Sequence, residues 1–224
     1  MESVERRMPR KQRLRDKNPD RHAELVRVAT RVFATEGYNA TNVNRVAELA
    51  GVGVGTLYNY FDDKDDLFLD CVEVAAATDL RIKQQRIDRL APALQMLHDI
   101  VRVERELMEL DPDGQQLLKS VFYGGNSQLE VGQAAQELYA GSIELVEQAL
   151  AKGVEGGVFD LQGQTRLAAL LITGMVETFH VLGDRLDSSD SDKDGPHPAD
   201  LAVELLCRGI LSEAGRQQGK VGGQ

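Results

Sequence analysis

Residues 41–64 read TNVNRVAELAGVGVGTLYNYFDDK, and they contain two short helical patterns separated by a glycine. Gly51 tolerates the positive φ that a tight turn requires. Val52 follows it, and its apolar side chain is expected to fill the inside of the turn between the two helices. A further short helix is expected over residues 54–60. Two short helices joined by such a turn form a helix-turn-helix. The apolar stripe of the first helix, at three- and four-residue spacing, consists of Val43, Val46, Ala47 and Ala50.

The boundaries of the neighbouring helices carry local signals. Asn18 followed by Pro19 is a strong helix start, and Gly37 marks the end of that helix. Thr41 is the expected N-cap of the next helix. Asp63 is expected to cap a long helix that begins at Lys64, with Asp66 at capping-box spacing. The apolar residues of the first helix, again at helical spacing, are Leu25, Val28, Ala29, Val32 and Phe33.

The rest of the chain also reads as helix, so the predicted fold class is all-α. A three-helix N-terminal domain precedes a larger helical domain. The long helix from Lys64 is expected to bury Leu67, Phe68, Cys71, Val74, Ala75 and Thr78. The expected later helices span residues 64–89, 92–110, 115–123, 129–153, 165–186 and 198–214, with a turn at residues 156–160. The expected domains are a flexible arm at 1–17, a helix-turn-helix domain at 18–63, a helical domain at 64–215 and a disordered tail at 216–224.

Charge is distributed unevenly along the chain. Residues 1–60 hold 11 Lys and Arg against 7 Asp and Glu, a net charge of +4, which leaves −14 for the remainder of a chain whose net charge is −10. Seven of these basic residues lie within residues 1–17, where apolar residues are scarce. A solvated tail is one interpretation. Its place before a helix-turn-helix favours an arm, including Arg10 and Arg13, that lies on the phosphate backbone or in the minor groove.

Composition excludes several classes. No stretch approaches the roughly 20 apolar residues that cross a bilayer, and the basic N-terminus lacks the apolar segment of a secretory signal. We therefore expect a cytoplasmic protein without membrane contact. Cys71 and Cys207 have no neighbours at metal-ligand spacing, so we expect two free thiols, no metal and no cofactor.

The segment at residues 29–68, ATRVFATEGYNATNVNRVAELAGVGVGTLYNYFDDKDDLF, resembles the DNA-binding region of the TetR family of transcriptional regulators. The resemblance covers about residues 20–70 and rests on three ordered motifs. They are the Phe-Ala-x-x-Gly-Tyr end of the first helix, the Val-Ala-x-x-Ala-Gly-Val turn, and Gly-Thr-Leu-Tyr-x-Tyr-Phe leading to Lys64. Many members carry Ser and a basic or polar residue where this chain has Gly53 and Val54.

The resemblance implies a set of DNA contacts. The third helix presents its outer face to the major groove, while Thr41 binds phosphate and Asn44 and Arg45 reach phosphate or a base edge. Because Gly53 and Gly55 weaken that helix, readout is expected to depend also on DNA shape and on the basic arm. The implied contacts, with Tyr60 and Lys64 as phosphate clamps, are Thr41, Asn44, Arg45, Val54, Gly55, Thr56, Tyr58, Asn59, Tyr60 and Lys64.

The resemblance also implies a homodimer on a palindromic operator, and a small, apolar effector that shifts the population away from the DNA-binding conformation. The expected dimer contacts are Leu167, Leu171, Gly174, Thr178, Leu201 and Leu205. The expected lining of the effector cavity is Met96, Met108, Phe122, Tyr123, Tyr139, Met175, Phe179 and His180, each of which is also a natural core residue. Repression is the expected sign of regulation, because it is the common mode of the family.

Alternatives remain open at this stage. Gly51, Gly53 and Gly55 lack the strand and spacing of a dinucleotide-binding loop. Residues 190–195 resemble the first half of a calcium loop, but the position of the bidentate Glu is Leu201, so an acidic loop is the plainer interpretation. A helical small-molecule-binding protein or enzyme without DNA function, and a regulator that responds to a partner protein, are the other hypotheses. The four His residues are scattered and suggest no catalytic arrangement.

Overall fold

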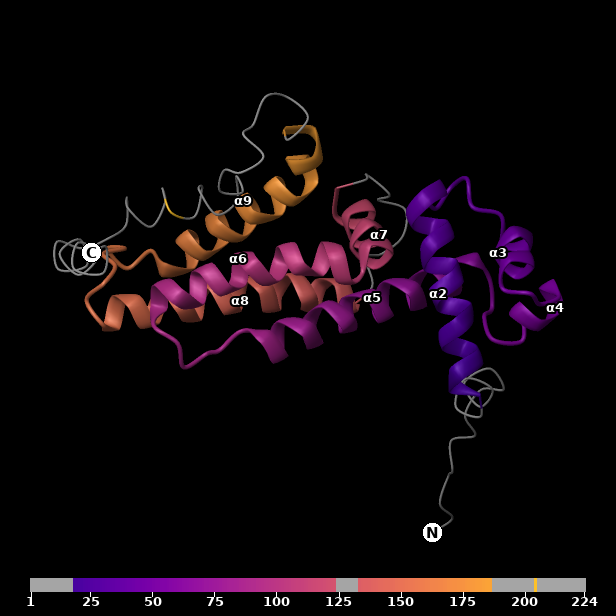
Figure 1. The fold of residues 1–224 in the computed structure, drawn as a ribbon, viewed down its shortest axis with the longest axis horizontal. Coiled ribbons are helices and arrows are strands. Elements are labelled where there is room, and N and C mark those ends of the chain that lie inside the picture. The colour runs from indigo at the N-terminus through magenta and orange to yellow at the C-terminus, as the bar shows by residue number, and fades with distance from the viewer. Residues whose placement is uncertain (1–17, 124–132, 187–203, 205–224) are drawn as a thin grey trace, which may run out of the picture. The chain divides into compact units, whose positions relative to one another are not determined.

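The computed structural model describes residues 18–123, 133–186 and Glu204, and every regular element in these parts of the chain is a helix (Figure 1). The all-α prediction is therefore confirmed for the described residues. None of these helices is long and apolar enough to cross a bilayer. The helices are α2 (Pro19–Glu36), α3 (Val43–Leu49), α4 (Val54–Leu57), α5 (Lys64–Arg86), α6 (Ala93–Leu110), α7 (Pro112–Tyr123), α8 (Gln133–Glu155) and α9 (Thr165–Leu186).

The described chain divides into two compact units. The first unit ends at Thr78, inside α5, and resumes at Asp111 to include α7. The second unit begins at Asp79 and contains the end of α5, α6, most of α8 and α9. The sequence places a domain boundary earlier, between residues 63 and 64. A long helix that contributes to two cores hides such a division from local sequence signals.

The predicted helix ends are largely confirmed because capping is a local interaction. The Asn18 side chain accepts a hydrogen bond from the Arg21 amide at 3.2 Å. Gly37 ends α2 at a φ of 78°. The Asp63 carboxylate accepts from the Asp66 amide at 2.8 Å at the start of α5. α9 spans the expected residues, whereas α5 stops at Arg86, before its predicted end. The helix predicted over 198–214 lies outside the described residues.

The turn between α3 and α4 follows a recurrent C-cap geometry. Gly51 has a φ of 64°, and its amide donates to the Glu48 carbonyl at 3.0 Å, while the Val52 amide donates to the Ala47 carbonyl at 2.9 Å. This pair of hydrogen bonds is the Schellman motif, in which glycine takes the left-handed position. The predicted helix-turn-helix is present. The same pair of bonds recurs after α8, where Gly157 has a φ of 69°.

Each unit has its own apolar core. In the first, α2 buries its predicted apolar face and packs against α3 and α7. Val74 is 44% exposed, so its predicted inward orientation is wrong. In the second, side chains from α5, α6, α8 and α9 form one cluster, and Figure 1 shows α6 beside α8. The largest fully buried side chains of this cluster are Met96, Leu97, Leu107 and Leu150.

We expect the second core to be sensitive to a single truncation on α6. Leu107 is fully buried, so Leu107→Ala is expected to lower the free energy of unfolding by about 2–5 kcal/mol through lost burial and a residual cavity. Leu110, on the same helix, is 54% exposed, and Leu110→Ala should change stability by less than about 0.5 kcal/mol. Urea unfolding followed by circular dichroism measures both; equal effects would contradict the described packing.

Candidate nucleic-acid interface and effector pocket

The outer face of the helix-turn-helix presents most of the predicted DNA contacts to solvent. Tyr58 is 42% exposed. Val54 is half-buried and sits at the first turn of α4, where the Gly53 N-cap provides no side-chain hydrogen bond. The exposed predicted contacts are Asn44, Arg45, Gly55, Thr56, Tyr58 and Asn59.

α4 is shorter than expected. It ends at Leu57 rather than at Tyr60, because the next backbone amides donate hydrogen bonds to carbonyls three residues earlier, as in a tighter turn. The Asn59 amide donates to the Thr56 carbonyl at 3.1 Å, and the Tyr60 amide donates to the Leu57 carbonyl at 2.9 Å. The buried Leu57 and Phe61 side chains anchor this tighter segment.

The predicted N-cap at Thr41 is wrong. Asn42 caps α3, since its side-chain oxygen accepts from the Asn44 amide at 2.9 Å. Thr41 is buried and donates its hydroxyl to the Gly37 carbonyl at 2.8 Å, closing the connection from α2. Thr and Asn are both strong caps, but the Thr41 hydroxyl is bonded to Gly37, so the cap falls at Asn42, one residue later than predicted. A phosphate contact by Thr41 stays a prediction.

Tyr60 belongs more to the core than to the surface. Only 6% of the residue is exposed, and its ring lies 6.4 Å from the His22 ring. The His22 Nε2 atom lies 2.6 Å from Asp70 Oδ2, which links the start of α2 to α5. Sequence reasoning missed this His22–Asp70 pair because its members lie 48 residues apart. Little of the Tyr60 side chain is therefore exposed for the predicted contact with phosphate.

Lys64 is held by Tyr38, which the sequence analysis did not single out. The Lys64 ammonium lies 4.4 Å from the centre of the Tyr38 ring, and 3.4 Å from the Asn39 carbonyl. The Tyr38 hydroxyl donates to Asp65, and its ring packs edge-on against Phe68 at 5.0 Å. Burial, together with this hydrogen bond to Asp65, raises the pKa of Tyr38 to about 12.

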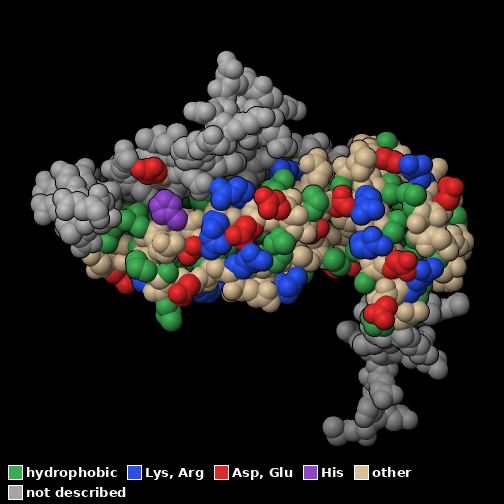
Figure 2. Space-filling model, viewed as in Figure 1, with side chains coloured by type: hydrophobic (Ala, Val, Ile, Leu, Met, Phe, Trp, Pro, Cys, Tyr) green, Lys and Arg blue, Asp and Glu red, His purple; other side chains and the backbone are tan. Residues whose placement is uncertain are grey.

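Charge alone does not mark the interface. On the face shown in Figure 2, Lys and Arg side chains are interspersed with Asp and Glu. Arg45 Nε lies 2.7 Å from Glu36 Oε1, so part of the positive charge on α3 is compensated. Arg10 and Arg13, from which the sequence predicts additional positive charge, lie outside the described residues.

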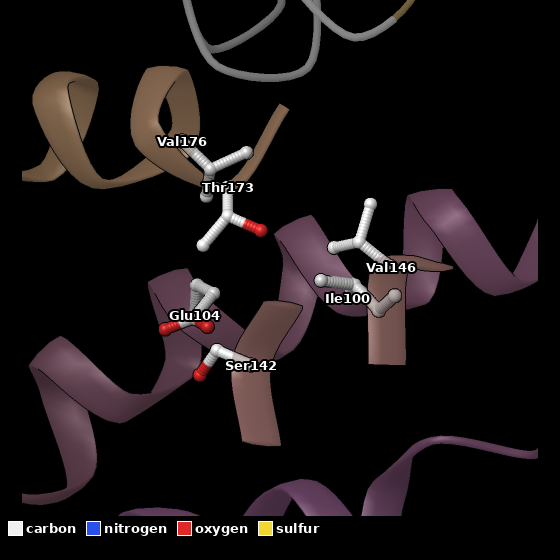
Figure 3. A pocket seen from close by; sticks show the side chains of 6 residues that line it. All are labelled: Ile100, Glu104, Ser142, Val146, Thr173 and Val176. Carbon is white, nitrogen blue, oxygen red and sulfur yellow. The ribbon is translucent and has the colours of Figure 1, made fainter. Parts of the chain in front are cut away.

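The second unit contains a pocket between α6, α8 and α9, with about 220 Å³ of empty space including its open side (Figure 3). Part of this space is open solvent, so the enclosed part is smaller. Apolar side chains form one part of the wall and polar side chains the other. The lining consists of Ile100, Glu104, Ser142, Val146, Thr173 and Val176.

A buried charge cluster adjoins this pocket. The Lys83 ammonium lies 2.8 Å from Asp79 Oδ1 and 2.6 Å from Glu104 Oε1, and it donates to Ser142 Oγ at 3.0 Å. Burial by itself lowers the pKa of Lys83, but the neighbouring carboxylates of Glu104 and Asp79 outweigh it, so the pKa is raised. Lys83 is therefore charged at neutral pH.

The predicted cavity lining differs from the observed one. Of the eight candidates, Met96 is buried in the core, Met175 packs against it, and Tyr139 is 38% exposed. None of the candidates with described side chains lines the pocket. Met108 and Phe122 are half-buried, and Tyr123, Phe179 and His180 have side chains outside the described part of the structure. The sequence did carry a signal for the adjoining charge cluster: Asp79 and Lys83 lie four residues apart within the buried face of α5.

Some of the residues predicted to form the dimer face lie within the described part of α9. Leu167, Leu170 and Leu171 are 51%, 40% and 64% exposed. Gly174 is half-buried, and the exposed Thr178 hydroxyl donates to its carbonyl at 2.7 Å. Leu201 and Leu205 lie outside the described residues.

Residues 25–71 match the sequence profile described as "Bacterial regulatory proteins, tetR family". This segment of the chain belongs to that family. A curated relative, the fatty acid metabolism regulator protein of Bacillus subtilis (strain 168), is 24% identical over 164 residues, which is 73% of this chain and 83% of the relative. The curated relatives found are named as regulators, and this chain is accordingly a transcriptional regulator rather than an enzyme.

Solved structures share the fold of this chain. The transcriptional regulator FadR from Bacillus subtilis in complex with stearoyl-CoA has a TM-score of 0.68 at 22% identity, covering 84% of this chain and 99% of that one. AibR in complex with isovaleryl coenzyme A and operator DNA has a TM-score of 0.61 at 14% identity, covering 85% and 97%. At these identities the likeness concerns the fold.

The raised pKa of Tyr38 predicts an unusual alkaline titration. The folded pKa of about 12 exceeds the usual value of 10, so Tyr38 favours folding below pH 10 and this contribution is lost as the pH rises from 10 to 12. Ultraviolet titration of the wild type minus the Tyr38→Phe variant isolates this tyrosine. A difference midpoint near pH 12 is expected, and one near pH 10 would contradict the Tyr38–Asp65 contact.

Proposed function

We propose that this chain is a ligand-responsive repressor that binds a palindromic operator as a homodimer and is released by a small effector with an apolar body. The observation that carries the proposal is the exposed face of α3 and α4. The buried Leu57 and Phe61 anchor it from within, while its outer residues have no structural role in the core. A rigid scaffold with polar side chains on one exposed turn is what base and phosphate contacts require.

Base readout is proposed to come from a small number of side chains. Thr56 and Val54 offer methyl groups for a thymine methyl, Asn44 offers an amide for an adenine edge, and Tyr58 reaches base or backbone. Nothing lies within 4 Å of a Cβ built at Gly53 or Gly55, so neither glycine is required by packing within the protein. A glycine on an exposed face allows DNA to approach the backbone closely.

A dimer is proposed because one short helix reads too few base pairs, and two copies on a two-fold axis read a palindrome. The exposed leucines of α9 form an apolar face that a second copy would bury. Gly174, on the same helix, permits close approach of a partner helix.

The effector is proposed to act by population shift, binding the conformation whose two DNA-binding heads are wrongly spaced. Two proteins of the same fold are described in complex with acyl-coenzyme A esters. These esters are therefore included in the first effector screen. The pocket between α6, α8 and α9 is the proposed effector site.

The DNA-binding proposal is tested by selecting an operator from random duplexes and titrating it at several salt concentrations. We expect a palindrome, and a slope of log affinity against log salt of about −0.9 per neutralised phosphate. Tyr58→Ala should weaken binding at least tenfold, since a lost contact in the groove costs about 1–3 kcal/mol. Glu73→Ala, an exposed change on α5, is the control. Failure to enrich any sequence would favour a helical binding protein without DNA function.

The dimer proposal is tested by charge substitution on α9. Leu171→Glu places a carboxylate on the proposed apolar interface and is expected to yield monomers, with a loss of operator affinity of at least tenfold because only one half-site is then read. Leu90→Glu, at a residue that is 88% exposed, should leave the dimer intact. Light scattering after size exclusion gives the mass. A Leu171→Glu variant that remained dimeric would place the interface elsewhere.

A further inference from the structure

Lys64 has acidic neighbours on both sides in the sequence, yet in the described part of the chain its ammonium is not paired with a carboxylate. Residues 62–66 read Asp-Asp-Lys-Asp-Asp. The ammonium lies instead 4.4 Å from the centre of the Tyr38 ring and 3.4 Å from the Asn39 carbonyl. Both partners are uncharged, so the positive charge of Lys64 is not neutralised. A lysine paired with a carboxylate would present much less net charge to an anion.

Three of the neighbouring carboxylates accept hydrogen bonds from other groups. The Asp63 carboxylate accepts from the Asp66 amide at 2.8 Å, and the Asp66 carboxylate accepts from the Asp62 amide at 2.8 Å. These two bonds cap the start of α5, where amides lack partners within the helix. The Asp65 carboxylate accepts from the Tyr38 hydroxyl. Each of these carboxylates is therefore held by a donor other than the lysine.

The Tyr38 ring is held in a fixed orientation by the core. It stacks on the Phe33 ring at 6.2 Å and packs edge-on against the Phe68 ring at 5.0 Å, and both phenylalanines are buried. The face of an aromatic ring carries partial negative charge and attracts a cation without cancelling its net charge. The ring thus gives the Lys64 ammonium one defined place, on a side chain that is itself half-buried.

We infer that Tyr38 is a positioning residue for DNA binding: its ring holds the unpaired Lys64 ammonium where a phosphate of the DNA backbone binds it. An ammonium has three donors, and the Asn39 carbonyl accepts at most one, so donors remain for phosphate oxygens. The inference rests on the proposed function, because it assigns a role within the proposed DNA interface. It requires that loss of the ring weaken DNA binding through Lys64, and not through a general loss of packing.

The contact itself is tested without DNA. Protons that lie over the face of an aromatic ring resonate at lower frequency, so the ε-methylene protons of Lys64 should be shifted to lower frequency than those of an exposed lysine. Carbon–proton correlation spectra of the full chain show this signal, and Lys64→Ala assigns it by its disappearance. Tyr38→Phe should keep the shift, because the ring remains, and Tyr38→Leu should abolish it. An unshifted Lys64 signal in the wild type would contradict the contact.

The role in binding is tested by the salt dependence of affinity. A phosphate contact does not depend on base sequence, so titrations use both a selected operator and a random duplex of the same length. In Lys64→Ala, the slope of log affinity against log salt should become less steep by about 0.9 for each subunit bound. Tyr38→Leu should lose the same amount, with affinity falling about fivefold or more at about 0.1 M salt. The conservative Tyr38→Phe should retain the wild-type slope.

A double variant separates positioning from packing. If the ring acts through Lys64, Tyr38→Leu combined with Lys64→Ala should bind no more weakly than Lys64→Ala alone. A purely structural effect of Tyr38→Leu would reduce affinity by the same factor in both backgrounds. Circular dichroism establishes that each variant is folded before titration. Should Tyr38→Leu not fold, Tyr38→Met takes its place, since an unbranched apolar side chain adapts to the same site.

An unchanged salt slope in folded Tyr38→Leu, or fully additive losses in the double variant, would overturn the inference. Either result with an enriched operator would leave the proposed function standing. Conversely, a chain that enriches no operator but loses slope on the random duplex in Tyr38→Leu would support the role of Tyr38 and contradict a sequence-specific repressor. A chain that binds neither duplex would contradict both proposals.

Discussion

A buried ammonium must have its three donors satisfied, and in the second unit Lys83 meets this requirement with groups from three helices. Asp79 lies one turn earlier on α5, Glu104 comes from α6, and Ser142 from α8. Apolar packing tolerates small sliding of one helix along another, whereas an ion pair at 2.6 Å does not. The charge cluster therefore fixes the register of α5, α6 and α8. The surrounding apolar core buries it, so that a shift in register would leave buried charges without partners.

The sequence was most informative where structure depends on neighbouring residues. Asn18, Gly37, Gly51 and Asp63 each act within four residues of their own position, so their roles in starting or ending helices are readable from spacing alone. The exceptions are also local. Thr41 and Asn42 are both good caps, and only the hydrogen bond from Thr41 to the Gly37 carbonyl decides between them. The pattern beyond Leu57 fits a helix, but the backbone there switches to bonds three residues apart.

The candidate pocket was not predictable in the same way. Its residues come from three helices and span positions 100 to 176, and no local spacing brings them together. Met and aromatic residues were the natural guess for a ligand cavity, yet Met96 packs in the core and Tyr139 lies on the surface. The more useful signal is an ionisable residue on an apolar helix face. Glu104 follows the buried Val103 on α6, and Lys83 follows the buried Ile82 on α5.

The position of the cluster along the chain relates the second unit to the helix-turn-helix. Asp79 is the first residue of the second unit, and α5 begins at Lys64, directly after the helix-turn-helix. Any change at Glu104 or Ser142 alters the balance of forces on Lys83, and therefore on α5. A buried cluster with a few discrete hydrogen-bonding arrangements is a two-state element of the kind that allosteric coupling requires. The buried charge cluster that fixes the register of α5, α6 and α8 thus includes two residues of the helix that begins directly after the helix-turn-helix.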